Sequence, residues 1–461
     1  MGDRQKLVLI GAGSTVFTQR LVADIILSGE IDRWELGLVD IDPVTLDAVD
    51  KLVRKMLALK GVDFPITSTV DRRDVLRGAD FVVTTIAVGG RRGWELDVQI
   101  PRKHHIFQPV GDTMMPGGIS RAMRMIPQMI AIANDVAELC PAAYFLNYSN
   151  PMTSVCRAIR KNTGVPVIGL CHGVHHVEGV LERFLGVAEG SIASYGYGLN
   201  HLTLLTHITC NGTDAFPLMR AKLDEQRGTF EQEIRANNEW HNTVTGRAPR
   251  ASDDPLTWSI FDRYGVFPVA LDRHITEFFP ERFPGGSYHG RTLGVDAFSI
   301  DGRITLGDTW FAEMMAVAHS SDPLPASYFE NVPGESEQLM QMMQSLVRDK
   351  RDVFSVNVPN QGTVPGLPAD AVLEMPAAAG AAGFTPLQSK ALPPALTAKL
   401  LAKIAAVEVT VDAALTGSFD LFVEALLTDG SVSEPDRAVA LAKDLIDAHK
   451  QYLPQFAGST R

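Results

Sequence analysis

The chain has 461 residues, of which 45% are hydrophobic and 21% charged, so it can bury a large core and form two or three domains. The formal net charge is −12 and no run of Lys and Arg forms a basic stripe, which argues against nucleic acid and anionic membranes as partners. No apolar run reaches the roughly 18 residues of a membrane span. A small molecule is therefore the expected partner.

The cellular location follows from the first residues and from the cysteines. An apolar strand pattern begins at Lys6, which leaves no room for a signal peptide, so the chain is expected in the cytoplasm. Four cysteines in 461 residues do not form a disulfide framework, which fits a reducing compartment. Any special cysteine is then expected to be a metal ligand or a nucleophile.

The first half of the chain alternates short apolar runs with longer helical patterns, which is typical of βαβ units and a parallel sheet. It thus predicts an α/β fold with a doubly wound, Rossmann-like parallel sheet, in which ligands bind at the carboxyl ends of the strands. In chain order, we predict a strand at 6–10, a helix at 15–29, a strand at 34–40, a helix at 43–60, and strands at 80–86, 143–147 and 165–170.

The second half has a different pattern of mixed strands and long helices. Residues 357–395 are rich in Pro, Gly and Ala and are predicted to be irregular, with helices following at 395–416 and 434–450. We therefore predict a nucleotide-binding domain at 1–170 and an α+β domain at 171–461.

A glycine-rich turn connects the first strand to the first helix. Gly11 permits a tight turn, and Gly13 lets the backbone approach a pyrophosphate at the helix N-terminus, close to Ser14 and Thr15. Val16 stands where the third glycine of the dinucleotide fingerprint would be. The turn alone is therefore also compatible with a plain connection between strand and helix.

The end of the second strand carries an acidic residue that supports the nucleotide interpretation. Asp40 is placed to accept hydrogen bonds from the adenosine ribose, which favours NAD over NADP. Its spacing from Gly13 is longer than the usual ~20 residues, so the connecting helix must be extended. Asp42 precedes a proline and is interpreted as a turn-forming residue.

A thiol and several imidazoles follow the strand predicted at 165–170. Cys171 and His172 come directly after it, and His201 lies 30 residues further along the chain. Such ligands suit a transition metal if they meet in space, but the spacing of a structural zinc site is absent. Taken alone, a Cys-His pair is more often packing plus a surface histidine.

Six motifs in order along nearly the whole chain resemble glycoside hydrolase family 4. The resemblance implies a nucleotide domain like that of lactate and malate dehydrogenases, a homodimer or homotetramer, and a glycosidase that uses NAD instead of two carboxylates. The motifs are Gly11-Ala12-Gly13-Ser14, Gly111-Asp112-Thr113 followed by Pro116-Gly117-Gly118, Asn150-Pro151-Met152, Cys171-His172-Gly173-Val174, Asn200-His201 and Asn357-Val358-Pro359-Asn360.

The same resemblance implies a metal site and a mechanism. Cys171 and His201 would hold an Mn²⁺-like ion. A hydride would pass from C3 of the sugar to NAD, which acidifies the C2 proton. A base would remove that proton, and the metal would stabilise the enediolate that forms. The aglycone would then be eliminated, and water addition and return of the hydride would complete the cycle.

Further site residues are assigned on the resemblance. Asp272 is expected to be the base at C2, although a surface pair with Arg273 is the plainer alternative. His172 is expected to assist the leaving group, with a structural histidine as an equally weighted alternative. Asn150 is expected to bind sugar hydroxyls, and Asp112 is assigned to the substrate or its surroundings.

The segments around Cys171 and Asp272 look most like the α-galacturonidase and α-glucuronidase branch, which predicts an α-D-hexuronide as substrate. A carboxylate at C6 suits a planar guanidinium. The candidates for that contact are Arg91, Arg92 and Arg273, with His274 beside the substrate. The alternatives are an α-galactosidase, α-glucosidase or 6-phospho-glycosidase of the same family.

Two interpretations outside the family were weighed. A 2-hydroxy-acid dehydrogenase would share the nucleotide domain, but it would leave Cys171 and His201 unexplained. A catalytically idle NAD-binding sensor is the other, and the retained Cys171, His201 and Asp272 argue against it.

Overall fold

The computed structural model describes residues 4–15, 17–28, 33–237, 247–332 and 338–458. Val16, which stands at the third glycine position of the fingerprint, therefore lies outside the described residues. Among the described residues, no helix is long and apolar enough to cross a bilayer.

The first half contains the predicted parallel sheet. Its strands lie in the order β6-β5-β4-β1-β2-β3, and all of these neighbours pair in parallel. The strands are β1 (Gln5–Ile10), β2 (Trp34–Val39), β3 (Ile66–Thr69), β4 (Phe81–Thr84), β5 (Tyr144–Asn147) and β6 (Ile168–Gly169), and the helices are α1 (Phe17–Leu27), α2 (Pro43–Lys60), α3 (Arg73–Leu76), α4 (Gly90–Lys103), α5 (Met115–Leu139) and α6 (Met152–Thr163).

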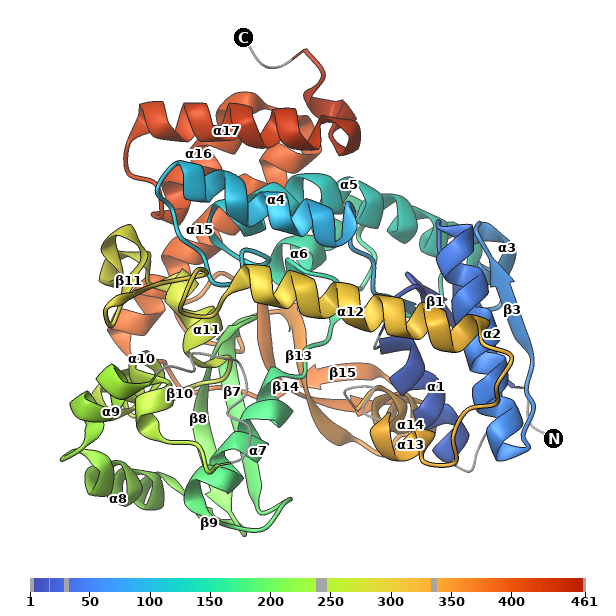
Figure 1. Ribbon diagram of the computed structural model, residues 1–461, viewed down its shortest axis with the longest axis horizontal. Helices are drawn as coiled ribbons and strands as arrows, with labels where there is room; N and C mark the ends of the chain where they lie inside the picture. Colours follow the sequence, from blue (N-terminus) through green and yellow to red (C-terminus); the bar gives the residue numbers. More distant parts are fainter. Residues whose placement is uncertain (1–3, 16, 29–32, 238–246, 333–337, 459–461) are drawn as a thin grey trace.

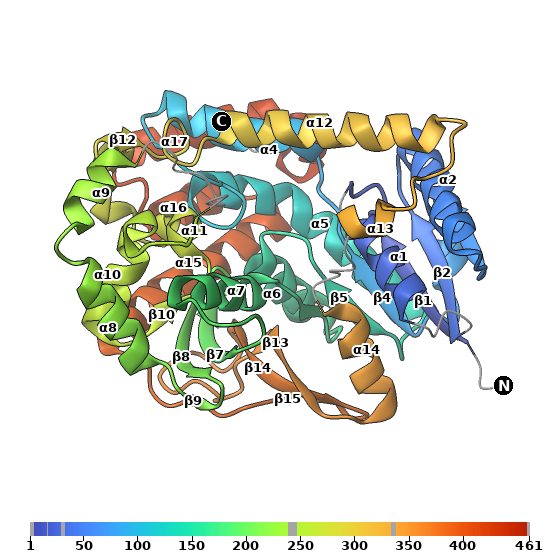
Figure 2. The ribbon, with the colours of Figure 1, turned by 60° about the horizontal axis from the view of Figure 1, so that its bottom comes forward.

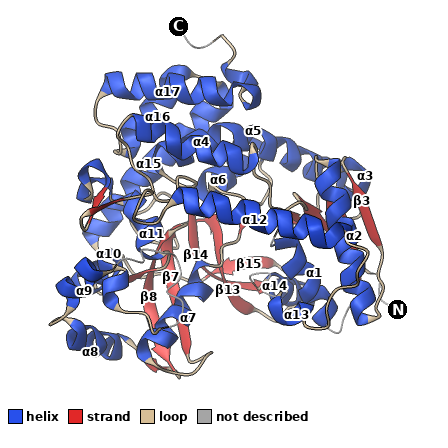
Figure 3. Cartoon of the chain, viewed as in Figure 1, coloured by secondary structure: helices blue, strands red, loops and turns tan. Residues whose placement is uncertain are grey.

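Alternating side chains of β1 enter two separate cores, which confirms the doubly wound prediction. Leu7 and Leu9 pack with α1 and α2, while Val8 and Ile10 pack with α5 and α6. Figure 3 shows the strands enclosed by helices. The α/β, Rossmann-like fold class is therefore confirmed.

Local sequence explains why α2 has the bounds predicted for it. The side chain of Asp42 accepts a hydrogen bond from Val44 N at the helix start, and Pro43 occupies the first turn. Gly61 ends the helix in the left-handed conformation with φ +62°. The interpretation of Asp42 as a turn-forming residue thus agrees with its observed place.

The second half extends the same sheet with antiparallel strands in the order β10-β8-β7-β14-β13, joined to β6 through β13. The sheet has thirteen strands in the part of the chain that the structure describes. The added strands are β7 (Ile192–Leu199), β8 (Leu202–Cys210), β9 (Thr213–Asp214), β10 (Phe267–Pro268), β13 (Asp352–Pro359), β14 (Val372–Gly380) and β15 (Gly383–Pro386), and a separate hairpin pairs β11 (Ser287–Tyr288) with β12 (Arg291–Thr292).

The helices of the second half cover both faces of the sheet. Helix α12 lies along the outside of the molecule, and α15, α16 and α17 return to pack with α4, α5 and α6 (Figures 1 and 2). They are α7 (Gly173–Leu185), α8 (Phe216–Gln226), α9 (Phe230–Ala236), α10 (Pro255–Tyr264), α11 (Leu271–Ile275), α12 (Ile300–His319), α13 (Tyr328–Asn331), α14 (Leu339–Arg348), α15 (Pro394–Thr416), α16 (Phe419–Asp429) and α17 (Pro435–His449).

The prediction of an irregular segment at 357–395 is wrong. The Ala- and Gly-rich part includes the last four residues of β14, 377–380, which pair with β13 on one side and β15 on the other. Ala and Gly are disfavoured in strands on average, but β14 is buried and packs against α6 and α14, so small side chains fit there. Ser345 of α14 even donates a hydrogen bond to Ala379 O at 2.7 Å.

The change from parallel to antiparallel pairing falls at the predicted division between residues 170 and 171. Because β13 pairs with β6 and the last helices pack with α5, the two halves share one sheet and contribute together to both cores that β1 enters. The domain boundary itself stays a prediction.

Candidate active site

A pocket of about 1080 Å³ lies at the carboxyl ends of β1, β2 and β4. The predicted nucleotide residues Gly11, Gly13, Ser14, Thr15 and Asp40 all line it. The first turns of α4 and the middle of α12 form its other walls. Its size and its place at the strand ends suit a dinucleotide.

The glycines of the first turn are required by the close packing around it. Gly11 has φ +94°, and a Cβ there would lie 2.8 Å from the backbone carbon of Thr85. A Cβ on Gly13 would lie 2.6 Å from Asp40 Oδ2, which instead accepts a hydrogen bond from Gly13 N at 2.8 Å. The structure therefore places the glycine turn and Asp40 together, as the sequence analysis expected.

A second cluster brings together three side chains that are distant in the sequence. Asp112 comes from the loop between α4 and α5, His201 from the tip of the β7–β8 hairpin, and His274 from α11. One ligand atom of each lies within 4.8 Å of the others. Two imidazoles and a carboxylate at this separation can hold a divalent transition-metal ion.

Burial favours the neutral, ligating form of both histidines. It lowers the pKa of His201, although the Asp112 carboxylate opposes the shift. Burial also lowers the pKa of His274 well below its ordinary value, and the neighbouring His201 adds to this effect. Both imidazoles are therefore uncharged near neutral pH and offer a nitrogen lone pair.

Hydrogen bonds orient the members of this cluster. Thr113 Oγ1 donates to Asp112 Oδ1 at 2.7 Å and lies 2.9 Å from His201 Nδ1, which can donate to it. This tautomer leaves Nε2 of His201 as the nitrogen that can bind a cation. Asn150 Nδ2 donates to Asp112 Oδ2 at 3.1 Å, so Asn150 and Asp112 lie together, as expected.

Glu277 fixes the loop that carries Asp112, and the sequence analysis assigned it no site role. Its Oε1 accepts hydrogen bonds from Val110 N at 2.8 Å and Gly111 N at 2.7 Å. The side chain is 1% exposed, and burial raises its pKa to about 8. Its sequence cue is the segment Glu277-Phe278-Phe279-Pro280, which is part of the resemblance to the α-galacturonidase and α-glucuronidase branch.

Glu374 braces the hairpin that carries His201, and it was also missed. Its Oε2 accepts hydrogen bonds from Asn200 Nδ2 at 3.2 Å and Thr203 Oγ1 at 2.7 Å, on either side of His201. His201 itself has φ +68°, a conformation that a non-glycine residue adopts at some cost. Because Glu374 lies on β14, inside the segment predicted to be irregular, sequence patterns could not place it there.

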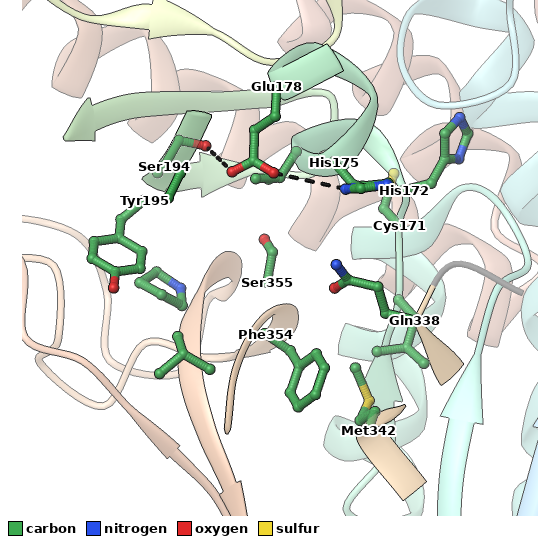
Figure 4. Close-up of a pocket in the computed structure, with 16 residues that line it drawn as sticks. Cys171, His172, His175, Glu178, Ser194, Tyr195, Gln338, Met342, Phe354 and Ser355 are labelled. Atoms are coloured by element: carbon green, nitrogen blue, oxygen red, sulfur yellow. Dashed lines mark hydrogen bonds and ion pairs between the residues drawn. The ribbon is translucent and has the colours of Figure 1, made fainter. Parts of the chain in front are cut away.

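Cys171 and His172 lie beside this cluster, at the junction of β6 and α7. Both line a second, smaller pocket of about 250 Å³, shown in Figure 4. The charge of His172 affects the pKa of both His201 and His274, which places it near them. The cluster of three ligands does not include Cys171.

Asp272, the expected base at C2, is held by donors from two neighbouring elements, and its role as a base stays a prediction. It is fully buried, and its carboxylate accepts hydrogen bonds from Leu256 N, Thr257 N, Thr257 Oγ1 and Tyr288 Oη, all at 2.7–2.8 Å. Two of these donors are the free N–H groups at the start of α10, where a negative charge is stabilised. With both oxygens engaged in these hydrogen bonds, Asp272 connects α11 to the start of α10.

The three candidate arginines separate into two groups. Arg91 and Arg92 both form ion pairs with Asp308 of α12, and Arg91 also lines the nucleotide pocket. The structure therefore does not bring these two arginines to the cluster of Asp112, His201 and His274. Arg273 is 7% exposed, and its Nε has no hydrogen-bond partner among the described residues. Burial lowers its pKa to about 10, which leaves it cationic, and Asp112 and Glu277 are among the charges that act on it.

Comparisons with known proteins agree over both halves of the chain. Residues 6–187 match the family described as Family 4 glycosyl hydrolase, and residues 196–432 match the Family 4 glycosyl hydrolase C-terminal domain. An α-glucosidase of Erwinia rhapontici is 29% identical, over 97% of this chain and 98% of its own. An α-galacturonidase of Thermoanaerobacterium saccharolyticum is also 29% identical, over 97% of this chain and 96% of its own.

Solved structures show the same fold. A 6-phospho-α-glucosidase from gut microorganisms, in complex with NAD and Mn²⁺, has a TM-score of 0.80 at 18% identity and covers 98% of this chain and 99% of its own. A malate dehydrogenase of Cryptosporidium parvum has a TM-score of 0.53 at 14% identity and covers 89% of this chain and 99% of its own.

The first prediction concerns the ionisation of Glu277. The folded-state pKa of about 8 lies above the ordinary 4.5, so the stability linked to this proton is present below pH 4.5 and is lost as the pH rises through 8. Glu277→Gln keeps the oxygen acceptor and cannot ionise. We expect wild-type unfolding free energy to fall relative to Glu277→Gln by up to about 1.4 kcal/mol per pH unit in this window.

Urea unfolding at several pH values measures this difference. Glu313→Gln, at an exposed position on α12, is the matched control and should follow the wild type. Parallel pH profiles for the wild type and Glu277→Gln would show that Glu277 is already ionised in the folded protein.

The second prediction concerns Glu374 and the cation site. Glu374→Gln replaces one carboxylate oxygen by an NH₂ group and disturbs the bonds to Asn200 and Thr203. We expect Mn²⁺ affinity, measured by calorimetry, to fall about 10- to 100-fold, the usual effect of losing an outer-shell partner. Ser355→Ala removes only the bond to Oε1 and should bind Mn²⁺ like the wild type. Equal affinities in a folded Glu374→Gln protein would contradict a positioning role.

Proposed function

The chain belongs to family 4 of the glycosyl hydrolases, and from this premise we propose that it hydrolyses α-linked hexuronides with NAD and Mn²⁺ as cofactors. The observation that carries the proposal is that Arg121 connects the nucleotide pocket with the Asp112-His201-His274 cluster. Arg121 lines the nucleotide pocket, donates to Asn150 O at 3.1 Å and acts electrostatically on Asp112. A nucleotide in the pocket and a cation in the cluster would therefore be neighbours.

The residues present fit both groups. The glycine turn and Asp40 form a cradle that a Cβ at Gly13 would fill. Nδ1 of His274 is buried and has no hydrogen-bond partner among the described residues, so a ligating nitrogen is available in the cluster. When bound, the nicotinamide supplies a hydride acceptor and donor, and the cation supplies a Lewis acid.

We assign the residue roles as follows. His201, His274 and Asp112 hold the cation, with Cys171 as the further ligand that the family resemblance implies. Asn150 orients Asp112 and binds substrate hydroxyls. His172 transfers a proton on the side of the leaving group. Asp272 acts indirectly, because its bonds to α10 fix the position of Arg273 and His274.

The uronide part of the proposal rests on Arg273. A buried guanidinium with an unpaired N–H is costly unless a ligand completes its hydrogen bonds. Arg273 is next in sequence to His274, and its charge is opposed by that of Arg303, so an additional anion is favoured there. A carboxylate on C6 of the sugar meets this requirement in a bidentate geometry.

Hydrolysis of p-nitrophenyl α-D-galacturonide and α-D-glucuronide tests the proposed function. We expect p-nitrophenol release only when NAD and Mn²⁺ are both present. The neutral and 6-phosphorylated α-glycosides serve as comparison substrates. Preferential release from one of these would contradict the uronide assignment, and release without NAD or Mn²⁺ would contradict the cofactor assignment.

Substitution of Arg273 tests the anion site separately. Arg273→Gln should lower kcat/KM for the uronide roughly 10- to 150-fold, because hydrogen bonds to charged groups contribute about 1.5–3 kcal/mol. The loss should be smaller for Arg273→Lys, which keeps the charge. Arg92→Gln removes a guanidinium that pairs with Asp308 and should leave uronide turnover at the wild-type level. Equal losses on uronides and neutral glycosides would show that Arg273 only supports the fold.

A further inference from the structure

The smaller pocket beside Cys171 is bounded by secondary structure on four sides. Helix α7 and strand β7 form one wall, and α14 and β13 form the other. Its volume of about 250 Å³ is roughly a quarter of that of the nucleotide pocket, which suits a single small ring. Figure 4 shows Glu178 and Ser194 on one side, with Gln338 and Met342 opposite them.

The polar lining contains the partly buried carboxylate of Glu178. Glu178 Oε1 accepts a hydrogen bond from Ser194 Oγ at 2.8 Å. Its Oε2 lies 3.7 Å from His175 Nδ1, which is beyond hydrogen-bond distance. Burial removes water from Glu178 and raises its pKa. A ligand hydroxyl that donates a hydrogen bond to the carboxylate would replace this water and stabilise the ionised form.

An aromatic platform lies at the edge of the same pocket. The ring of Tyr195 is 40% exposed and stacks on His207 with centroids 5.4 Å apart and an interplanar angle of 13°. Phe354 and Met342 add apolar surface. Hydroxyl acceptors beside flat apolar surface suit a sugar ring, which has polar edges and apolar faces.

The pocket adjoins the catalytic cluster across two residues. Cys171 and His172 line the pocket, while His172 also acts electrostatically on His201 and His274. In Figure 4 the imidazole of His172 points away from the centre of the pocket. Cys171 and His172, which the proposed function assigns to the reaction, thus also line this pocket, as a site for the group on the other side of the scissile bond requires.

We propose that this pocket is the leaving-group subsite and that it takes a neutral, hydroxyl-bearing pyranose. This inference rests on the proposed glycosidase function. Neutral sugars are favoured because an acidic ring would bring a second carboxylate against Glu178, and like charges repel in a partly buried site. The subsite therefore favours a neutral sugar, whereas the site at Arg273 favours a sugar with a carboxylate.

Two substrates with the same reacting sugar test the proposal on the holoenzyme. One is a hexuronic acid α-linked to a neutral hexose, and the other is the p-nitrophenyl α-hexuronide, whose leaving group has no sugar hydroxyls. Glu178→Gln should lower the ratio of kcat/KM for the disaccharide to kcat/KM for the aryl glycoside at least roughly tenfold. Glu189→Gln, at an exposed position between α7 and β7 outside the pocket, should keep the wild-type ratio.

Direct binding gives a readout that does not depend on turnover. With D-glucose as the probe, saturation-transfer NMR should detect binding to the wild type and to Glu189→Gln but not to Glu178→Gln. The proposal would be overturned if Glu178→Gln kept the wild-type ratio of kcat/KM values. It would also be overturned if the wild type did not bind D-glucose, or if Glu178→Gln still bound it. If neither glycoside is hydrolysed, the glycosidase function fails, and the NMR result still decides whether the pocket binds a neutral sugar.

Discussion

The partly buried carboxylate of Asp112 is the group on which the arrangement of the site depends. Removing a charge from water costs several kcal/mol, so its oxygens need partners. Thr113 comes from the same loop and Asn150 from the end of β5, while His201 is reached through Thr113. Three separate connections of the fold thus converge on one carboxylate.

The loop that holds Asp112 is itself fixed from outside. Glu277 accepts hydrogen bonds from two backbone N–H groups of this loop, and it follows three residues after His274 in the chain. The same short segment therefore supplies a ligand and the support for a second ligand. Glu374 does the equivalent for His201 from β14, and it can do so only because β13 and β14 extend the parallel sheet past β6. The antiparallel extension is thus what places a cation site next to a nucleotide pocket.

Features set by local sequence were predicted well. The bounds of α2 follow from Asp42, Pro43 and Gly61, and the glycine turn with Asp40 follows from steric requirements at a strand end. The meeting of Asp112, His201 and Asn150 was expected only through ordered family motifs, because loop residues far apart in sequence give no local pattern of contact. β14 was missed because burial between two strands and two helices overrode the low strand propensity of Ala and Gly.

Asp272 shows how much about a carboxylate the sequence leaves open. Its place beside Arg and His suggests a base, and the structure adds that three donors at the start of α10 and the hydroxyl of Tyr288 hold it. Glu277 and Glu374 are equally buried and also serve as acceptors for neighbouring segments. Glu178 differs from all three, because it is only partly buried and lines a pocket. The surroundings of a carboxylate, more than its place in a motif, separate groups that support the site from groups that can receive a ligand.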